Sequence, residues 1–419
     1  MKVLVSAYAC GVNRGSESDV GWHWVTETAR RHETWVITRA VNAQSIESAL
    51  RQNPIPQLHF VYVDLPKWLR VWKQLPLGVR AYYYLWQFLA YVPAWRLHRK
   101  HHFDVVHHVT FCTYWQPSML AFIDAPFVWG PVGGGEATPR SFFSSLSARG
   151  KLYESSRSLG QALAWLDPFL RHTAHRASLT LATTNETAVR LNTLGCRTVC
   201  VFSQVGITSD AAANPPGPGR HRDGAFRICS AGRLEHLKGL EYGLRAVARL
   251  REAVPRVEYW IFGDGPERAR LTELSVRLGI SEQVFFWGET PHADLLAALT
   301  TCDVLLHPGL HESGGLICME AMAAGCPVVC LDLGGLATQV TEETGVKVPA
   351  LTPPKAICDL ACALEELAFD PARRNALGRN ARRRAMEAFQ WDNKVSAFWE
   401  LLEQNGIGAT IRCDEPISA

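Results

Sequence analysis

The segment His311-Glu312-Ser313-Gly314-Gly315-Leu316-Ile317-Cys318-Met319-Glu320-Ala321 follows the apolar run Val304 to His307 and carries two carboxylates on either side of a glycine pair. This order predicts a buried strand, a tight turn and a helix that begins near Gly315. The first N–H groups of such a helix can hold an anion. Glu312 on the loop and Glu320 in the helix can then each accept hydrogen bonds from a pair of hydroxyls. A phosphate between two polyols describes a nucleotide sugar; the alternative is an ordinary loop acid and a helix Glu that favours the dipole.

Strand-like and helix-like runs alternate on both sides of this segment, which is typical of parallel sheets covered by helices on both faces. We therefore expect an α/β protein with two facing, Rossmann-like, doubly wound lobes. Their ligand should lie between them at the carboxyl ends of the strands. The Pro/Gly cluster at 214–219 interrupts the alternation and predicts a linker. The expected boundaries are 1–208 for the first lobe, 209–224 for the linker, 225–388 for the second lobe, 389–405 for a last helix and 406–419 for a tail.

The strands are expected at specific runs of the sequence. In the first lobe these runs are 2–9, 34–38, 58–63, 105–109, 127–129 and 179–183. In the second lobe they are 226–231, 258–262, 284–286, 304–307 and 328–331.

The composition indicates a globular enzyme, because 47% of the 419 residues are hydrophobic and 20% are charged. Twelve cysteines are scattered without a Cys-x-x-Cys pair, so we expect reduced and mostly buried thiols. The first residues predict a buried strand and not a signal peptide. The expected location is the cytoplasm or the inner face of the membrane.

The charge is unevenly distributed, since residues 1–205 carry 21 Lys and Arg against 12 Asp and Glu. Between Leu65 and Phe103 there are seven basic residues, no acid and nine interleaved Trp, Tyr and Phe side chains. This mixture suits an anionic membrane surface or a phosphate-bearing acceptor, although a helix with a buried aromatic face explains the aromatics equally well. A net charge of +3 is too small for a nucleic-acid-binding protein, so no nucleic acid is expected as a partner.

Two basic residues follow the strand that ends at Ala231, in Gly232-Arg233-Leu234-Glu235-His236-Leu237-Lys238-Gly239. Arg233 and Lys238 can turn toward a diphosphate and stabilise the negative charge of a leaving nucleotide. Loop cations are more often solvated, and only their place at a strand end opposite Glu312 favours the functional interpretation.

These motifs, together with Phe262-Gly263-Asp264-Gly265-Pro266 and the later Gly325, Pro327 and Val328, resemble the family 4 retaining glycosyltransferases of GT-B fold. The resemblance covers roughly 160 residues of the second half. It implies that the donor is a nucleotide-diphospho-sugar, without any other cofactor. It also implies that the final helix, after Phe389-Gln390-Trp391-Asp392, crosses back to the first lobe.

The resemblance assigns roles to single residues. Arg233 and Lys238 would bind the donor pyrophosphate, Glu312 and the backbone of Gly314, Gly315 and Leu316 the transferred sugar, and Glu320 the ribose. Glu312, Arg233 and Lys238 would be the catalytic residues, and Gly263 would line the donor site.

Two loops of the first half resemble a bacterial branch of the same family. The first is Gly11 to Trp22, whose Gly15 would let the backbone approach the donor and whose Glu17 would bind the acceptor. A dinucleotide-binding Gly-x-Gly-x-x-Gly is absent from it, which argues against a nicotinamide enzyme. The second is Phe127 to Glu136, where Glu136 is a candidate acceptor-binding residue. Many members of the family carry a His after that strand. Gly130-Pro131 occupies this place here, so the resemblance assigns no catalytic His at this position.

Ten of the fifteen histidines lie in residues 1–205, including His107 and His108 in a predicted strand. His108 could accept the acceptor proton and His107 could orient the acceptor; a strand-end His is more often a hydrogen-bonded structural residue. We expect no metal site, because the cluster of His98, His101 and His102 lacks a Cys or acid at ligand spacing.

The sequence thus predicts a retaining, metal-independent glycosyltransferase that acts on a glycan or a lipid-linked acceptor. The alternatives are a nucleotide-sugar epimerase or a phosphorylase of the same fold, or a catalytically silent protein of the membrane surface.

Overall fold

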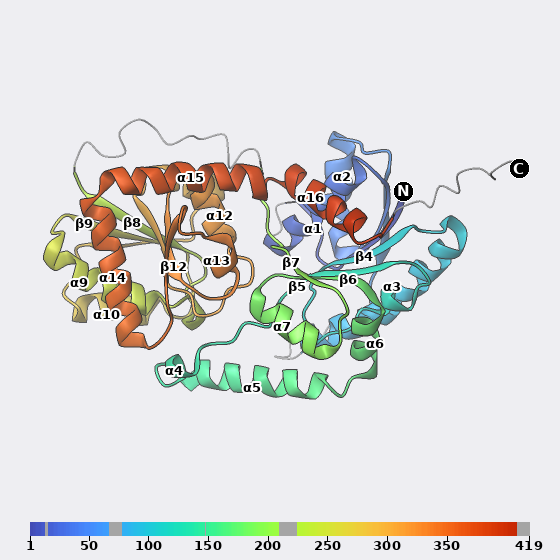
Figure 1. The fold of residues 1–419 in the computed structure, drawn as a ribbon, viewed down its shortest axis with the longest axis horizontal. Coiled ribbons are helices and arrows are strands. Elements are labelled where there is room, and N and C mark those ends of the chain that lie inside the picture. Colours follow the sequence, from blue (N-terminus) through green and yellow to red (C-terminus); the bar gives the residue numbers. More distant parts are fainter. Residues whose placement is uncertain (13–15, 67–77, 147, 209–223, 409–419) are drawn as a thin grey trace, which may run out of the picture.

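The structure is a computed structural model that describes residues 1–12, 16–66, 78–146, 148–208 and 224–408. Two α/β lobes lie side by side along the long axis of the molecule (Figure 1). The N-terminal lobe contains a seven-stranded sheet and the second lobe a six-stranded sheet. The predicted two-lobed architecture is therefore confirmed.

The first sheet has the strand order β3-β2-β1-β4-β5-β6-β7, and all of its neighbouring strands pair in parallel. Its central strands consist of buried residues on both faces, because helices cover the sheet from both sides. The strands are β1 (Lys2–Ala7), β2 (Glu33–Arg39), β3 (Leu58–Val63), β4 (Val105–Thr110), β5 (Phe127–Val132), β6 (Ala177–Ala182) and β7 (Val199–Val201).

The helices of this lobe include a segment that the sequence pattern did not reveal. The β5–β6 connection contains three helices, and neither these helices nor the short strand β7 was predicted. The helices are α1 (Ser16–Ala29), α2 (Ala43–Gln52), α3 (Gly78–His101), α4 (Arg140–Phe143), α5 (Ala148–Ala164), α6 (Pro168–Arg176) and α7 (Asn185–Leu194), with 3-10 turns η1 (Ala40–Asn42) and η3 (Met119–Phe122).

The second sheet has the order β10-β9-β8-β11-β12-β13 and is also parallel. Its strands are β8 (Phe226–Ala231), β9 (Val257–Phe262), β10 (Val284–Gly288), β11 (Val304–His307), β12 (Val328–Leu331) and β13 (Gly345–Val348). Its helical elements are η4 (His236–Lys238), α9 (Leu240–Ala253), α10 (Arg268–Arg277), α11 (His292–Thr301), α12 (Leu316–Ala323), α13 (Gly334–Gln339), α14 (Pro353–Phe369) and α15 (Pro371–Phe389). Every predicted strand of this lobe is present, whereas β13, α13 and η4 were not predicted.

The last helix returns to the first lobe, as predicted. Helix α15 runs along the second lobe toward the first, and α16 (Trp391–Gln404) continues onto the first lobe (Figure 1). The ring of Phe398 packs edge-on against that of Trp24 in α1, with centroids 5.3 Å apart. Burial of these large aromatic side chains fixes the end of the chain to the N-terminal lobe.

The β5–β6 connection forms a second link between the lobes. Helix α5 runs beneath both lobes in Figure 1. Phe142 of α4 packs edge-on against Tyr242 of α9, and the ring of Tyr153 in α5 contacts that of His236. The β5–β6 connection of the first lobe therefore also packs against the second lobe.

Some sequence predictions concern residues outside the described ranges. The Pro/Gly linker cluster at 214–219 is among them, as is the tail from residue 409 onward. Within the described ranges, no helix combines the length and the apolar character needed to cross a membrane.

Candidate active site

Two adjoining cavities follow the carboxyl ends of the second sheet's strands. The first has a volume of about 930 Å³ and lies between the lobes, because α1 contributes Glu17 and Asp19 while the second lobe contributes Lys238, Glu312 and Glu320. The second has a volume of about 880 Å³ and is lined by loops that follow β8, β9 and β10. Both cavities share the backbone of Ala231 and Gly232. The site therefore lies at the edge of the sheet where parallel α/β proteins bind their ligands.

Glycine allows the loops after β8 and β9 to approach each other at the floor of these cavities. Gly263 has a φ of +112°, and a Cβ atom there would lie 2.2 Å from the carbonyl oxygen of Gly232. Any side chain would separate the two loops. Gly263, which was predicted to line the donor site, thus allows the loops after β8 and β9 to lie in direct contact.

The side chain of Glu312 lines the first cavity and lies close to three other residues. Lys238 Nζ forms a short hydrogen bond with Glu312 Oε2, His307 Nε2 lies 3.6 Å from the same oxygen, and the Gly315 N–H donates to Oε1 at 3.1 Å. Burial alone would raise the pKa of Glu312, but His307 and Lys238 together hold it well below its usual range. Glu312 is therefore an anion paired with a cation at the cavity wall.

Helix α12 begins beside this carboxylate, as predicted. Gly315 precedes it with a φ of +59°, and its Cβ would lie 2.7 Å from Gln339 Oε1. The Gln339 amide also donates to the carbonyl of Gly314. Gly314, Gly315 and Leu316 all line the cavity, so the N-terminal end of α12 faces the space next to Lys238.

Glu320 lies one turn further along α12 and is 5% exposed. Its Oε1 is 2.7 Å from Nε2 of His292, at the start of α11. This hydrogen bond to Glu320 raises the pKa of His292 and outweighs the effect of burial. The two residues form a polar pair that lines the first cavity. Glu320 is the residue predicted to bind a ribose.

Arg233 lies in the second cavity and forms an ion pair with Glu235 at 3.1 Å. Its side chain is 73% exposed, so it is free to reorient. The structure thus brings Arg233, Lys238, Glu312 and Glu320 to one continuous crevice, although these residues are distant in sequence.

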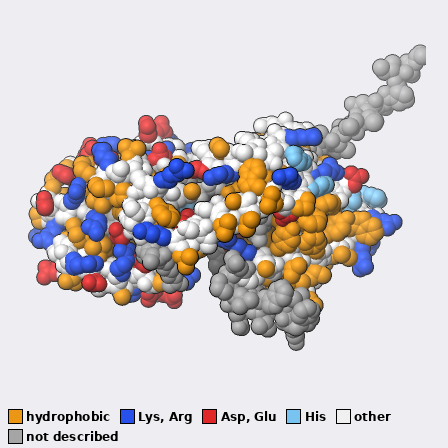
Figure 2. All heavy atoms as spheres, turned by 90° about the horizontal axis from the view of Figure 1, so that it is seen from below, with side chains coloured by type: hydrophobic (Ala, Val, Ile, Leu, Met, Phe, Trp, Pro, Cys, Tyr) orange, Lys and Arg blue, Asp and Glu red, His pale blue; other side chains and the backbone are white. Residues whose placement is uncertain are grey.

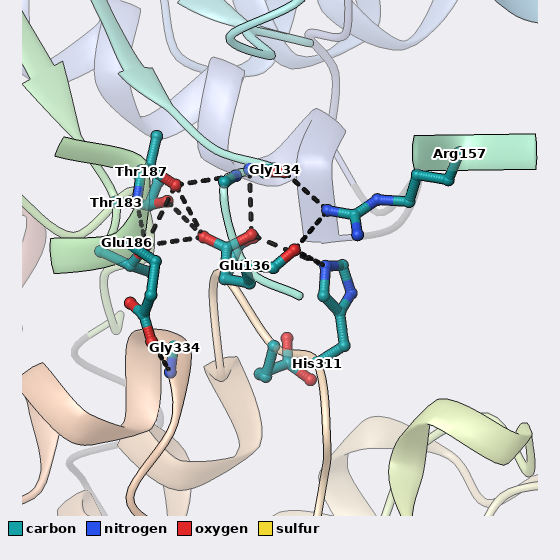
Figure 3. Close-up of polar contacts among 12 residues, drawn as sticks. Gly134, Glu136, Arg157, Thr183, Glu186, Thr187, His311 and Gly334 are labelled. Atoms are coloured by element: carbon teal, nitrogen blue, oxygen red, sulfur yellow. Dashed lines mark hydrogen bonds and ion pairs between the residues drawn. The ribbon is translucent and has the colours of Figure 1, made fainter. Parts of the chain in front are cut away.

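Glu136 lies directly between the lobes instead of in the cavity (Figure 3). Its carboxylate accepts hydrogen bonds from Thr184 at 2.8 Å, Thr187 at 2.9 Å and the Gly134 N–H at 3.0 Å, all in the first lobe. Ser313 of the second lobe donates to Oε2 at 2.7 Å. With these four donors, a longer contact from Thr183 at 3.4 Å and 3% exposure, the carboxylate has no acceptor site left for a substrate. The predicted acceptor-binding role therefore does not fit this arrangement.

The backbone around Glu136 is also shared between the lobes. Its carbonyl oxygen accepts hydrogen bonds from Arg157 of α5 at 2.6 Å and from His311 of the second lobe at 3.1 Å. Nearby, Glu186 accepts from the Gly334 N–H at 3.0 Å, and the Gly335 N–H donates to the carbonyl of Glu312 at 2.7 Å (Figure 3). First-lobe carboxylates thus hold the two second-lobe loops that position Glu312.

The two candidate histidines are part of the core and line neither cavity. His107 is 1% exposed, contacts the Gly130 carbonyl oxygen at 2.7 Å and stacks on Phe398. His108 is equally buried and lies 2.9 Å from the hydroxyl of Tyr83. Burial lowers the pKa of His107 to about 3 and that of His108 to about 4. Both rings are neutral near pH 7, and the structural interpretation of them holds.

The first lobe contributes Glu17 to the cavity, where the sequence predicted acceptor binding. Its Oε1 accepts a hydrogen bond from the Phe111 N–H at 2.8 Å, and burial raises its pKa despite this bond. Gly15, the predicted donor residue of the same loop, lies outside the described residues. Asp19 and Gln204 line the same cavity and were not predicted.

His292 and Ser313 are further residues to which the sequence analysis assigned no role. Pro291-His292 follows β10 at the same edge as the other motifs, so its position at a strand end was an available signal. The contact of Ser313 with Glu136 joins residues 177 positions apart, and no local pattern reveals it.

The fold and the crevice define a class of protein: two facing Rossmann-like lobes with a returning C-terminal helix are the GT-B fold. Sucrose-phosphate synthase from Thermosynechococcus elongatus superposes with a TM-score of 0.62 at 18% identity, over 96% of this chain and 98% of that one. Anabaena HepE in complex with UDP and glucose superposes with a TM-score of 0.62 at 18% identity, over 96% of this chain and 100% of that one. Similarity at this level of identity establishes the fold.

The second lobe also has recognisable sequence relatives. Residues 216–384 match the family described as "Glycosyl transferases group 1". A glycogen synthase of Mycobacterium tuberculosis is 33% identical over 189 residues, which are 45% of this chain and 45% of that protein. The matched region thus spans about half the length of the curated relative. The family match over residues 216–384 contains Arg233, Lys238, Glu312 and Glu320.

Proposed function

We propose that this protein is a retaining glycosyltransferase of family 4, which transfers a sugar from a nucleotide-diphospho-sugar to an acceptor. The observation that carries the proposal is the convergence of two cations, Arg233 and Lys238, and two carboxylates, Glu312 and Glu320, on one crevice. A nucleotide sugar has the complementary order of groups: a diphosphate between a ribose and a hexose.

In the proposed complex, the donor diphosphate lies against Arg233, Lys238 and the N-terminal end of α12. Glu312 accepts hydrogen bonds from hydroxyls of the transferred sugar, and Glu320 accepts them from the ribose. The donor phosphate would replace Glu312 as the partner of Lys238, and Arg233 would exchange Glu235 for the diphosphate. Both exchanges preserve charge pairing while the donor binds.

The proposed reaction is an exchange of bonds at the anomeric carbon. The bond from this carbon to the diphosphate oxygen breaks, and the acceptor oxygen forms a bond with it on the same face. The acceptor proton passes to the leaving phosphate oxygen. Arg233, Lys238 and the helix end stabilise the charge on the leaving group, which is the main contribution asked of the protein. The proposal needs no metal or cofactor.

The acceptor would enter from the first lobe, where Glu17 and Asp19 line the cavity. We propose a glycan or a lipid-linked precursor as the acceptor, in the cytoplasm or at the inner face of the membrane. Carboxylates suit an acceptor rich in hydroxyls, and the basic, aromatic surface of this lobe suits a lipid-linked one.

Release of nucleoside diphosphate from a panel of nucleotide sugars tests the proposal, with UDP sugars first because Anabaena HepE is a fold neighbour in complex with UDP and glucose. Thermal shifts with free nucleoside diphosphates identify the base, since ligands of the folded state raise Tm. We expect one diphosphate to stabilise the wild type, and its sugar to be consumed in the presence of a glycan or lipid acceptor. NMR of the product should show the anomeric configuration of the donor.

Three results would contradict parts of the proposal. Conversion of the donor sugar without an acceptor would identify an epimerase, and inversion at the anomeric carbon would exclude the retaining route. Absence of binding and turnover with every nucleotide sugar would leave the silent-protein alternative.

A further inference from the structure

Helix α3 is apolar on two opposite faces. Tyr82, Tyr83 and Trp86 are at most 1% exposed and pack into the core of the first lobe, as the buried-helix interpretation predicts. On the other face Leu85, Phe88, Val92 and Trp95 are 36%, 38%, 45% and 41% exposed. Their spacing of three and four residues places them in one row. A helix that only packs on a core would carry polar residues in this row.

Neighbouring elements extend the row into a surface. Phe169 of α6 lies between Phe88 and Phe122, with ring centroids 5.3 Å and 6.1 Å away, and Phe122 of η3 is 42% exposed. Leu166, in the turn before α6, is 75% exposed. We call Leu85, Phe88, Val92, Trp95, Phe122 and Leu166 the apolar face. Viewed from below Figure 1, hydrophobic side chains form a broad area over α3, with basic side chains at its outer edge (Figure 2).

Helix α5 adds a second exposed row on the same lower side of the molecule. Leu152, Leu159 and Leu163 are 72%, 63% and 57% exposed, and their spacing also puts them on one side of the helix. The chain runs from this row directly to Leu166 and α6. Such a contiguous apolar area is unusual for a surface that faces only water.

The charges around the apolar face are complementary to an anionic surface. Helix α3 contains no Asp or Glu, and its last turns carry Arg96, Arg99 and Lys100. The Arg99 guanidinium lies over the Trp95 ring, 4.8 Å from its centroid. Two acids lie nearby. Asp167 caps α6 and accepts a hydrogen bond from Tyr84, whereas Asp124 is fully exposed and pairs with Arg176 at 3.2 Å.

We propose that the apolar face docks on a lipid bilayer that contains anionic lipids. Tryptophan and phenylalanine enter the interface between head groups and acyl chains, while the adjacent arginines and lysine attract the negative head groups. The inference deepens the proposed function, because a lipid-linked acceptor would be concentrated at the same membrane.

Flotation of the full-length protein with vesicles tests the proposal. We expect binding to vesicles of equal parts phosphatidylcholine and phosphatidylglycerol, and roughly tenfold weaker binding to phosphatidylcholine alone, because the basic residues lose their partners. The triple variant Phe88→Ser, Val92→Ser, Trp95→Ser should lose roughly tenfold or more of the binding to anionic vesicles.

A control replaces three apolar residues elsewhere that are more exposed than Phe88, Val92 and Trp95: Val189→Ser, Val276→Ser and Leu351→Ser, whose wild-type residues are 64%, 61% and 63% exposed. This control should bind vesicles as the wild type does. Circular dichroism and Tm show whether each variant folds. If the Phe88/Val92/Trp95 variant does not fold, Arg96→Gln, Arg99→Gln, Lys100→Gln replaces it and should abolish the preference for anionic vesicles.

Several outcomes would overturn the proposal. One is a wild type that floats with neither kind of vesicle, and another is a folded apolar-face variant that still binds fully. A dimer in sedimentation velocity that the triple variant dissociates would assign the face to a second copy of the chain. Nucleotide-sugar binding is measured without vesicles, so failure of the proposed function is recognised separately.

Discussion

Glu312, which is partly buried, and Glu136, which is fully buried, are two carboxylates with lowered pKa values in neighbouring parts of the molecule, and they differ in their partners. Glu312 pairs with the Lys238 ammonium at a cavity wall. Glu136 is surrounded by hydroxyl and N–H donors, and one of these comes from the other lobe. An ion pair at a cavity can be exchanged for a ligand, whereas a carboxylate saturated by fixed neutral donors holds structure in place. The partners, more than burial or pKa, separate the two roles.

The largest effect on activity is expected from the ion pair of Glu312 and Lys238. Glu312→Gln and Lys238→Ala should each reduce kcat/KM by roughly 100- to 1,000-fold, because each removes a charged contact to the donor or to its leaving group. Tm should change by only a few degrees. As a control, Lys355→Ala removes an exposed Lys–Asp pair of α14 and should leave turnover unchanged. Near-normal turnover in both site variants would contradict the assigned site.

A smaller loss of activity and a larger loss of stability are expected at Glu136. Glu136→Ala leaves Thr184, Thr187 and the Gly134 N–H without their acceptor in a buried site, which should lower the free energy of unfolding by about 2–4 kcal/mol. Turnover should fall roughly tenfold, because the loop that holds Glu312 loses its support. Urea unfolding and steady-state kinetics measure the two effects. A loss of activity as severe as that of Glu312→Gln, with unchanged stability, would return Glu136 to the substrate site.

Acid should affect Glu136 in a defined direction. Burial raises the pKa of Glu136. His311, Ser313 and Thr184 lower it by more than burial raises it, so the pKa lies below the ordinary value of 4.5. The stabilisation is therefore present above pH 4.5 and is lost as pH falls toward the folded-state pKa. In Glu136→Gln, Tm should fall less steeply than in the wild type below pH 4.5. An unchanged slope would show that this carboxylate does not contribute.

The contact between Ser313 and the Glu136 carboxylate, one of several between the lobes, can be tested without disturbing the rest of the cluster. Ser313→Ala removes one hydrogen bond to Glu136 and leaves the three first-lobe donors in place. We expect a loss of about 1 kcal/mol in stability and a few-fold decrease in kcat. The control is Ser156→Ala on α5, which removes an exposed hydrogen bond within a helix. Equal kinetics in the two variants would argue against coupling through Ser313.

The smallest effect on ligand affinity is expected at His292 and Glu320, the proposed ribose-binding part of the crevice. The pKa of His292 is raised by its bond to Glu320, so this contribution is complete below pH 6.5 and is lost as pH rises through the folded-state pKa. His292→Asn should remove this part of the pH dependence of Tm above pH 6.5, and nucleoside diphosphate affinity should change by only a few-fold. A variant that retains the wild-type pH profile would show that the pair does not titrate there.

The second lobe was more predictable than the first for a physical reason. Its strands are mostly apolar runs, Gly232-Arg233 and Gly263 directly follow two of them, and Glu312 lies in the loop after a third. Parallel strands bring such positions to a common edge, so local patterns were enough to collect the crevice residues. In the first lobe, His107 and His108 were candidates for a strand end, but they lie in the middle of β4, which is covered on both faces, and their rings are buried. Sequence position alone did not distinguish an exposed strand end from a buried strand.

The sequence by itself determined the two parallel sheets, the helix that returns to the first lobe and the order of the donor-site motifs, since periodicity and strand-end glycines act over a few residues. The tertiary structure decided which polar residues remain open to a ligand. Thr184, Thr187 and Ser313 converge on Glu136 from distant parts of the chain, and α6 and η3 extend the outer row of α3. These contacts depend on how whole elements pack, which no local pattern encodes.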